Sequence, residues 1–62
     1  MPYKLKGIRV NMGIQQQELA KKLGITPQYL NRIEKGLVDP RRSLMIEISK
    51  ALDTSVVELF FN

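Results

Sequence analysis

Residues 15–36 read QQQELAKKLGITPQYLNRIEKG, and this stretch contains two short helix patterns separated by a glycine. Leu19 and Leu23 are one helical turn apart, which predicts a helix over about residues 16–23. Gly24 follows directly and ends this helix, because glycine adopts the left-handed conformation that closes a helix without steric cost. The first half of the stretch is therefore a short helix with a defined stop.

A second helix begins two residues later. The Thr26 hydroxyl can cap its first turn, and Pro27 at the first helical position gives up only an N–H that would have no partner. Leu30 and Ile33 form its inner stripe. Gly36 then ends it.

The connection between these helices is too short for them to lie antiparallel, and a short turn with glycine makes two helices cross steeply instead. Ala20 is small where the helices come close, and Ile25 anchors the start of the second one. The sequence therefore predicts a helix-turn-helix over about residues 16–34.

With the inner stripe buried, the second helix turns its other face outward. Gln28, Asn31 and Arg32 lie on that face, with Thr26 and Pro27 at its leading end. Gln and Asn can make two hydrogen bonds to adenine, Arg can make two to guanine, and Thr or Pro can contact a thymine methyl. We expect these five residues to face base edges in the major groove of DNA.

The rest of the chain is also helical in its apolar spacing. We expect a first helix over about residues 3–12, a fourth over residues 43–52, and a last one over about residues 55–61 that begins with the capping box Ser55–Glu58. The predicted fold is all-α, with five short helices in one domain over residues 1–62.

The composition excludes several classes of function. The chain has 62 residues with no Cys and no His, so we expect no thiolate or imidazole metal site, no cofactor and no small-molecule ligand. A catalyst would need a carboxylate or Ser–Lys pair in a cleft, and we expect no enzyme. No apolar run is long enough to span a membrane, and the N-terminal MPYKLKGIRV lacks the apolar core of a signal peptide, so the expected location is the cytoplasm.

Charge is unevenly distributed along the chain. Residues 1–42 carry nine Lys and Arg against three acids, a net charge of +6, whereas residues 43–62 carry −2. A basic front with an acidic back indicates a polyanionic partner on one side, although a merely soluble surface gives a similar composition.

From Leu5 to Phe60 the chain resembles the helix-turn-helix domain of phage repressors and Cro proteins, often called the Xre family. The matching elements are Ile8-Arg9, Gly13-Ile14, Gln16-x-Glu18-Leu19-Ala20, Gly24-Ile25-Thr26, Leu30, Ile33-Glu34-x-Gly36, Pro40 and Ile48-x-x-Ala51-Leu52. The resemblance implies a compact, lambda-repressor-like domain that binds double-stranded DNA and regulates transcription. It also implies a homodimer, which we expect to be a repressor that reads a palindromic operator.

The resemblance also suggests roles for polar residues around the predicted reading helix. It implies that Arg9 and Glu34 form a structural pair between the first and third helices, and that Gln16 holds a backbone phosphate. Gln15 stands where the family usually has Ser or Thr, so we expect the cap of this helix to be weaker or shifted to a neighbouring residue. The further residues that we expect at or near phosphate are Gln17, Tyr29, Lys35, Arg41 and Arg42.

The C-terminal VVELFFN contains more apolar residues than one inward stripe uses. Val56, Leu59 and Phe60 satisfy the core, and Val57 and Phe61 are left over. We expect a two-fold interface of Val57, Phe61 and the adjoining Phe60, with loosely packed terminal residues as the alternative. The alternative function on the same fold is an antitoxin or a protein-bridging module.

Overall fold

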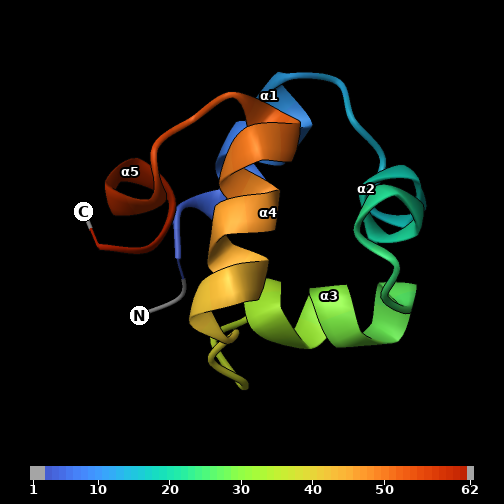
Figure 1. Cartoon of the computed structure of the whole chain (residues 1–62). Helices are drawn as coiled ribbons and strands as arrows, with labels where there is room; N and C mark the ends of the chain where they lie inside the picture. Colours follow the sequence, from blue (N-terminus) through green and yellow to red (C-terminus); the bar gives the residue numbers. More distant parts are fainter. Residues whose placement is uncertain (1–2, 62) are drawn as a thin grey trace.

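The computed structural model describes residues 3–61, in which five helices pack around one core (Figure 1). Their bounds are α1 Leu5–Asn11, α2 Gln16–Leu23, α3 Pro27–Glu34, α4 Arg42–Leu52 and α5 Val56–Phe60. The five predicted helices are thus present in the predicted order. The first is shorter than expected, because Lys4 donates its N–H to the Leu59 carbonyl oxygen at 3.2 Å and the chain turns into the helix only from there.

The core takes side chains from all five helices. Its buried residues are Leu5, Leu19, Ala20, Leu30, Ile33, Ile48, Leu52, Leu59 and Phe60. In Figure 1 the helix α4 runs through the middle, with α5 on one side and α2 and α3 on the other. Because α4 packs against both α2 and α5, it joins the two ends of the molecule.

Local signals set the helix ends. Gly13, Gly24 and Gly36 all have positive φ, as expected at helix stops. Ser55 accepts a hydrogen bond from the Glu58 N–H at 3.1 Å and so caps α5. The end of α4 differs, because Asp53 adopts the left-handed conformation with φ 49° although it is not a glycine.

Tyr3, which precedes α1, contacts two other parts of the fold. The Tyr3 hydroxyl donates a hydrogen bond to Asp39 in the loop between α3 and α4. The Tyr3 ring also packs edge to face on Phe60, with the ring centroids 4.9 Å apart. Tyr3 therefore links α5 to the loop that follows α3.

Candidate nucleic-acid interface

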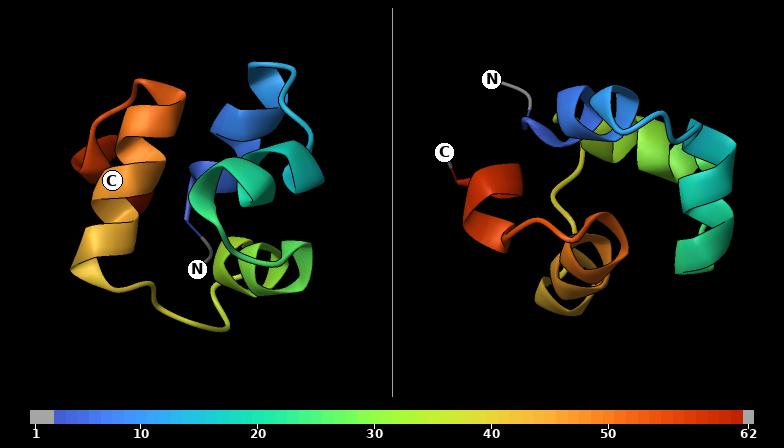
Figure 2. Two further views of the ribbon diagram at one scale, coloured as in Figure 1. Left: turned by 45° about the vertical axis from the view of Figure 1, so that its right-hand side comes forward. Right: turned by 90° about the horizontal axis from the view of Figure 1, so that it is seen from above.

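The turn between α2 and α3 fixes the position of α3. Gly24 has φ 72°, and the Ile25 N–H returns to the Ala20 carbonyl oxygen at 3.0 Å. Ala20 is completely buried. Figure 2 shows the result: α2 and α3 cross steeply, as the sequence predicts.

The helix α3 has a capped start and an anchored inner face. The Tyr29 N–H donates to Thr26 Oγ1 at 3.1 Å, and Pro27 occupies the first turn. Leu30 and Ile33 are completely buried. The orientation of α3 about its own axis is therefore set by the core, and its outer face has to point to solvent.

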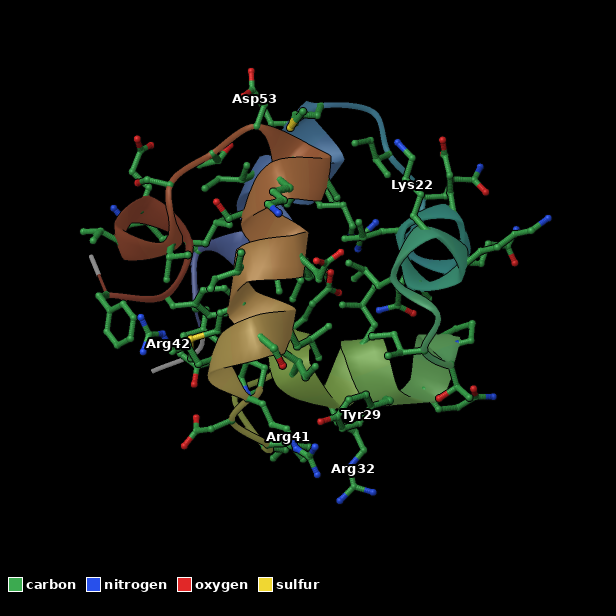
Figure 3. All side chains as sticks on the ribbon, in the orientation of Figure 1. Lys22, Tyr29, Arg32, Arg41, Arg42 and Asp53 are labelled. Carbon is green, nitrogen blue, oxygen red and sulfur yellow. The ribbon has the colours of Figure 1, made fainter. Side chains whose placement is uncertain are left out.

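Four of the five predicted base-reading residues are exposed: Thr26, Pro27, Gln28 and Arg32. Figure 3 shows that Arg32 points away from the bundle, with Tyr29 on the same lower edge of the molecule. Tyr29 is half-buried, so its ring lies against the domain. Gln28 and Arg32 are four residues apart, and this spacing brings them onto one face of α3.

Asn31, the fifth predicted base reader, lies differently. It is half-buried, and its Oδ1 accepts a hydrogen bond from Gln16 Nε2 at 3.3 Å. Asn31 is therefore less exposed than Gln28 and Arg32, with which the sequence placed it on the outer face of this helix. Each helical residue turns the side chain by about 100°, so Asn31 lies on the flank of α3 that faces α2.

Arg9 and Glu34 form the ion pair between α1 and α3 that the family resemblance suggested. Arg9 Nε lies 2.6 Å from Glu34 Oε2, and Arg9 Nη2 lies 3.3 Å from Glu34 Oε1. The Arg9 Nη1 also donates to the Ile14 carbonyl oxygen at 2.7 Å. Both side chains are buried, with exposed fractions of 7% for Arg9 and 0% for Glu34.

Gln16 joins the same polar cluster. Its Nε2 donates to Glu34 Oε1 at 2.9 Å, so the side chain of this first residue of α2 lies against α3. Sequence reasoning treated Gln16 as a phosphate ligand and missed this contact, because the partner is 18 residues away along the chain. Within residues 3–61 no buried side-chain nitrogen or oxygen lacks a hydrogen-bond partner.

Gln15 and Glu18 form a capping box at the start of α2, with Gln15 in place of the Ser or Thr that is usual in the family. Gln15 precedes the helix, and its N–H donates to Glu18 Oε1 at a long 3.4 Å. Gln17 is exposed, and its Nε2 donates to Gln15 Oε1 at 3.3 Å. These contacts leave backbone N–H groups in the first turn of α2 without an intrahelical partner.

The basic residues after α3 divide into two sets. Lys35 and Arg41 are exposed, and in Figure 3 both Arg41 and Arg32 point to the lower edge of the molecule. Arg42 begins α4 but points toward α5. The structure thus brings Arg41 to the exposed edge of α3 and directs Arg42 away from it.

Arg42 lines an apolar groove between α4 and α5. The groove has a volume of about 500 Å³, and its other lining residues are Met45, Ile46, Val56 and Phe61. Phe61, the C-cap of α5, is 68% exposed, and Val57 near the start of α5 is 61% exposed. Phe60, in contrast, is 6% exposed, so its ring belongs to the core and has to be removed from the predicted interface.

Among residues 3–61 there is no group of three or more His, Cys, Asp and Glu side chains that could hold a metal ion. No helix in that part of the chain is long and apolar enough to cross a membrane.

The geometry is that of a DNA-reading domain: a steep helix pair, an anchored second helix with polar side chains outward, and basic residues beside it. A helix-turn-helix family model matches residues 5–59, and the chain belongs to this family. The expected kinship with phage repressor and Cro-type domains is confirmed. The protein is therefore a helix-turn-helix transcriptional regulator with a DNA-binding fold, and the family is not one of enzymes.

Individual relatives agree with this assignment. An uncharacterized helix-turn-helix-type transcriptional regulator of Methanocaldococcus jannaschii is 38% identical over 60 residues, which cover 97% of this chain and 91% of the relative. The restriction-modification controller protein C.AhdI of Aeromonas hydrophila has a TM-score of 0.83 at 28% identity, over 92% of this chain and 86% of that one.

A third similar structure was solved with DNA. The biofilm master regulator SinR, in complex with DNA, has a TM-score of 0.76 at 35% identity, over 86% of each chain. Some matched chains are longer, since this chain covers 57% of the solved clp gene regulator ClgR of Corynebacterium glutamicum.

Proposed function

We propose that this protein is a homodimeric repressor that reads a palindromic operator by inserting α3 into the major groove. The observation that carries the proposal is the exposed face of α3, where Gln28 and Arg32 stand outward on a helix fixed by Leu30 and Ile33. Such a regulator acts in the cytoplasm, where its operator lies.

The side chains at this face suit base recognition. Arg32 can donate two hydrogen bonds to guanine O6 and N7, and Gln28 can pair with adenine N6 and N7. Thr26 and Pro27 stand at the leading end of the helix, where an apolar contact with a thymine methyl is possible. These contacts would supply discrimination between sequences.

Affinity would come from contacts to the backbone. Arg41 and Lys35 flank the reading helix with exposed positive charge, and Tyr29 can offer its hydroxyl to a phosphate. The first turn of α2, at Gln16 and Gln17, can offer backbone N–H groups in the same way. Of the two arginines after the loop, we assign phosphate contact to Arg41, because Arg42 lines the groove toward α5.

The second copy would dock at the apolar end of the molecule. Phe61 and Val57 are both more than half exposed, and Phe61 borders the groove on α4. An exposed apolar patch of this kind on a small domain favours self-association. Two copies joined there would offer two reading helices, and half-sites about 34 Å apart would lie on one face of the duplex.

The test is selection of bound sequences from a random duplex pool, followed by a salt titration on the selected site. We expect a palindrome with half-sites about 10 base pairs apart, and repression of a reporter whose promoter overlaps it. No enrichment, with only weak salt-sensitive binding, would contradict the proposal. It would favour the antitoxin or protein-bridging function instead.

A further inference from the structure

Four polar side chains from three helices form one continuous chain of hydrogen bonds. Arg9 on α1 donates to Glu34 on α3, Gln16 on α2 donates to the same carboxylate, and Gln16 also donates to Asn31 on α3. The donors and acceptors along this chain are fixed, because an ionised carboxylate can only accept hydrogen bonds and an amide nitrogen can only donate them.

Glu34 fixes which atoms of this chain accept and which donate. Its carboxylate is completely buried and receives two hydrogen bonds from Arg9, so it is held as an acceptor. Gln16 therefore has to turn its amide nitrogen toward Glu34, at 2.9 Å. The flipped amide would set its oxygen against the oxygen of the buried Glu34 carboxylate, and partial burial makes that arrangement costly.

The orientation of the Gln16 amide in turn fixes the orientation of the Asn31 amide. The Gln16 nitrogen has two hydrogens, and the one not given to Glu34 points to Asn31 Oδ1 at 3.3 Å. Asn31 thus has its oxygen turned inward and its nitrogen turned outward. In the part of the chain that the structure describes, no buried side-chain atom lacks a partner, and none of the hydrogen bonds there uses Asn31 Nδ2, so this nitrogen reaches solvent.

We propose that this chain of hydrogen bonds makes Asn31 a donor-only contact to DNA, with Gln16 as the positioning residue that fixes its amide. The inference rests on the proposed function. A free asparagine pairs with adenine by donating to N7 and accepting from N6, whereas Asn31 offers the two N–H groups alone. Its ligand is a hydrogen-bond acceptor, either guanine O6 or N7 and thymine O4 on a base edge, or a phosphate oxygen.

The same geometry changes the role of Gln16. Both hydrogens of its amide are used inside the protein, so its side chain has no donor left for a phosphate. Phosphate contact at the start of α2 falls to backbone N–H groups, and Gln16 acts on DNA through Asn31.

The experiment starts from the operator selected by the wild-type protein, so a failure of the proposed function is seen before any variant is made. Binding is then measured to operators carrying each of the four base pairs at every position. Asn31→Ala identifies the contact. We expect it to remove a preference for guanine or thymine at one position per half-site, by roughly 5- to 150-fold.

If Asn31→Ala weakens all sequences alike, the acceptor is a phosphate. A preference for adenine at the Asn31-dependent position, or no effect of the substitution, overturns the proposal.

The positioning role of Gln16 is tested by Gln16→Met, which frees the Asn31 amide to turn over. We expect adenine to become tolerated at the Asn31-dependent position, whereas a merely structural role would lower binding to all sequences by the same factor. The matched control is Gln15→Met, an exposed neighbour, which should keep the base preference of the wild type. An unchanged profile in Gln16→Met overturns the assignment.

A second measurement, hydrogen exchange of side-chain amides, uses the wild-type protein without DNA and so does not depend on any variant folding. In the free protein, the side-chain N–H groups of Gln16 should exchange with water more slowly than those of the exposed Gln28, and those of Asn31 should exchange as fast as Gln28. Protected Asn31 hydrogens beside unprotected Gln16 hydrogens would mean the opposite arrangement of donors and acceptors and would overturn the proposal.

Discussion

At the residue scale, the most constrained side chain is that of Glu34. It is completely buried, yet it accepts hydrogen bonds from Arg9 and Gln16 on two other helices. Removing one partner of a buried ion pair leaves the other charge without compensation, which costs more than the pair contributes as a whole. The chain is short, and its core supplies only about 3 to 5 kcal/mol.

Arg9→Met should therefore unfold most of the protein at 25 °C, because an unpaired Glu34 costs about 3 to 5 kcal/mol. Circular dichroism during a urea titration measures the free energy of unfolding. Arg32→Met removes an exposed arginine instead and should change that free energy by less than about 0.5 kcal/mol. A urea midpoint for Arg9→Met equal to that of the wild type would show that the pair contributes nothing.

Gln28→Ala and Arg41→Ala should separate base reading from phosphate binding. Gln28→Ala should cost about 1 to 3 kcal/mol on the selected operator and relax its preference at one position, because a base contact is lost. Arg41→Ala should weaken all sequences alike and reduce the slope of binding against salt by about 1. Fluorescence anisotropy on operator and random duplexes measures both, and equal losses for both variants on both duplexes would reject the division.

At the scale of single helices, α4 ends on a residue poorly suited to its conformation. The left-handed region costs an ordinary residue roughly 1 to 2 kcal/mol, and Asp tolerates it better than most. Asp53 has φ 49° there and is exposed (Figure 3), so no packing compensates for the strain.

Asp53→Gly should raise the free energy of unfolding by about 0.5 to 1 kcal/mol, since the relief of strain exceeds the extra freedom of the unfolded chain. Thermal and urea unfolding test this. Lys50→Gly introduces a glycine inside α4 instead and should lower stability by about 1 kcal/mol. If Asp53→Gly destabilises the protein as Lys50→Gly does, the strain at Asp53 is not real.

Sequence signals for the helices were strong because they are local. A glycine stop, the Thr26–Pro27 start and the Ser55 cap each act within a few residues, and the structure contains all of them. Apolar spacing then gave the order of the five helices, since each inner stripe has to be buried.

Features that depend on residues far apart in the chain were predicted less well. Asn31 was expected to point outward, but its partner Gln16 lies 15 residues earlier on another helix. Phe60 was assigned both to the core and to the adjoining interface, and the contact with Tyr3, 57 residues earlier in the chain, helps to bury its ring in the core. The direction of Arg42 likewise depends on how α4 and α5 meet.

At the scale of the whole molecule, the exposed face of α3 includes none of the residues that line the apolar groove, which come from α4 and α5 and from Phe61. Arg32 and Arg41 lie below α3 and the start of α4, whereas the groove lies between α4 and α5 (Figure 3). One copy can therefore use the groove and the reading edge at the same time, as a dimer on DNA requires.

Phe61→Asp should produce a monomer with weaker operator binding, because a charge at a 68% exposed ring disrupts an apolar contact without entering the core. Sedimentation equilibrium measures the mass. Val10→Asp introduces the same charge at a 56% exposed apolar residue on α1 and should leave the dimer intact. An unchanged mass for Phe61→Asp would refute the interface.

The hydrogen bond between Tyr3 and Asp39 should make the free energy of unfolding depend on pH in the alkaline range. The hydrogen bond from Tyr3 to Asp39 raises the pKa of Tyr3 above its ordinary 10.0, with burial and the negative charge of Asp39 adding to the effect. Because the folded pKa exceeds the unfolded one, this stabilisation is complete below pH 10 and is lost as pH rises through the raised value.

Tyr3→Phe should therefore be less stable than the wild type at pH 8, and the difference should shrink above pH 10. Urea midpoints of both proteins at the two pH values measure it. A difference that is constant over this range would mean that the Tyr3 hydroxyl does not carry the effect.

The buried chain of hydrogen bonds also determines how this protein can acquire a new target site. Gln28 and Arg32 are exposed, so a library that randomises both positions should consist almost entirely of folded members. Asn31 is tied through Gln16 to the buried Glu34, so each change there also alters the interior. Retargeting, whether by selection in the laboratory or by mutation in a genome, is therefore expected to proceed through Gln28 and Arg32 first, with Asn31 changing only together with Gln16.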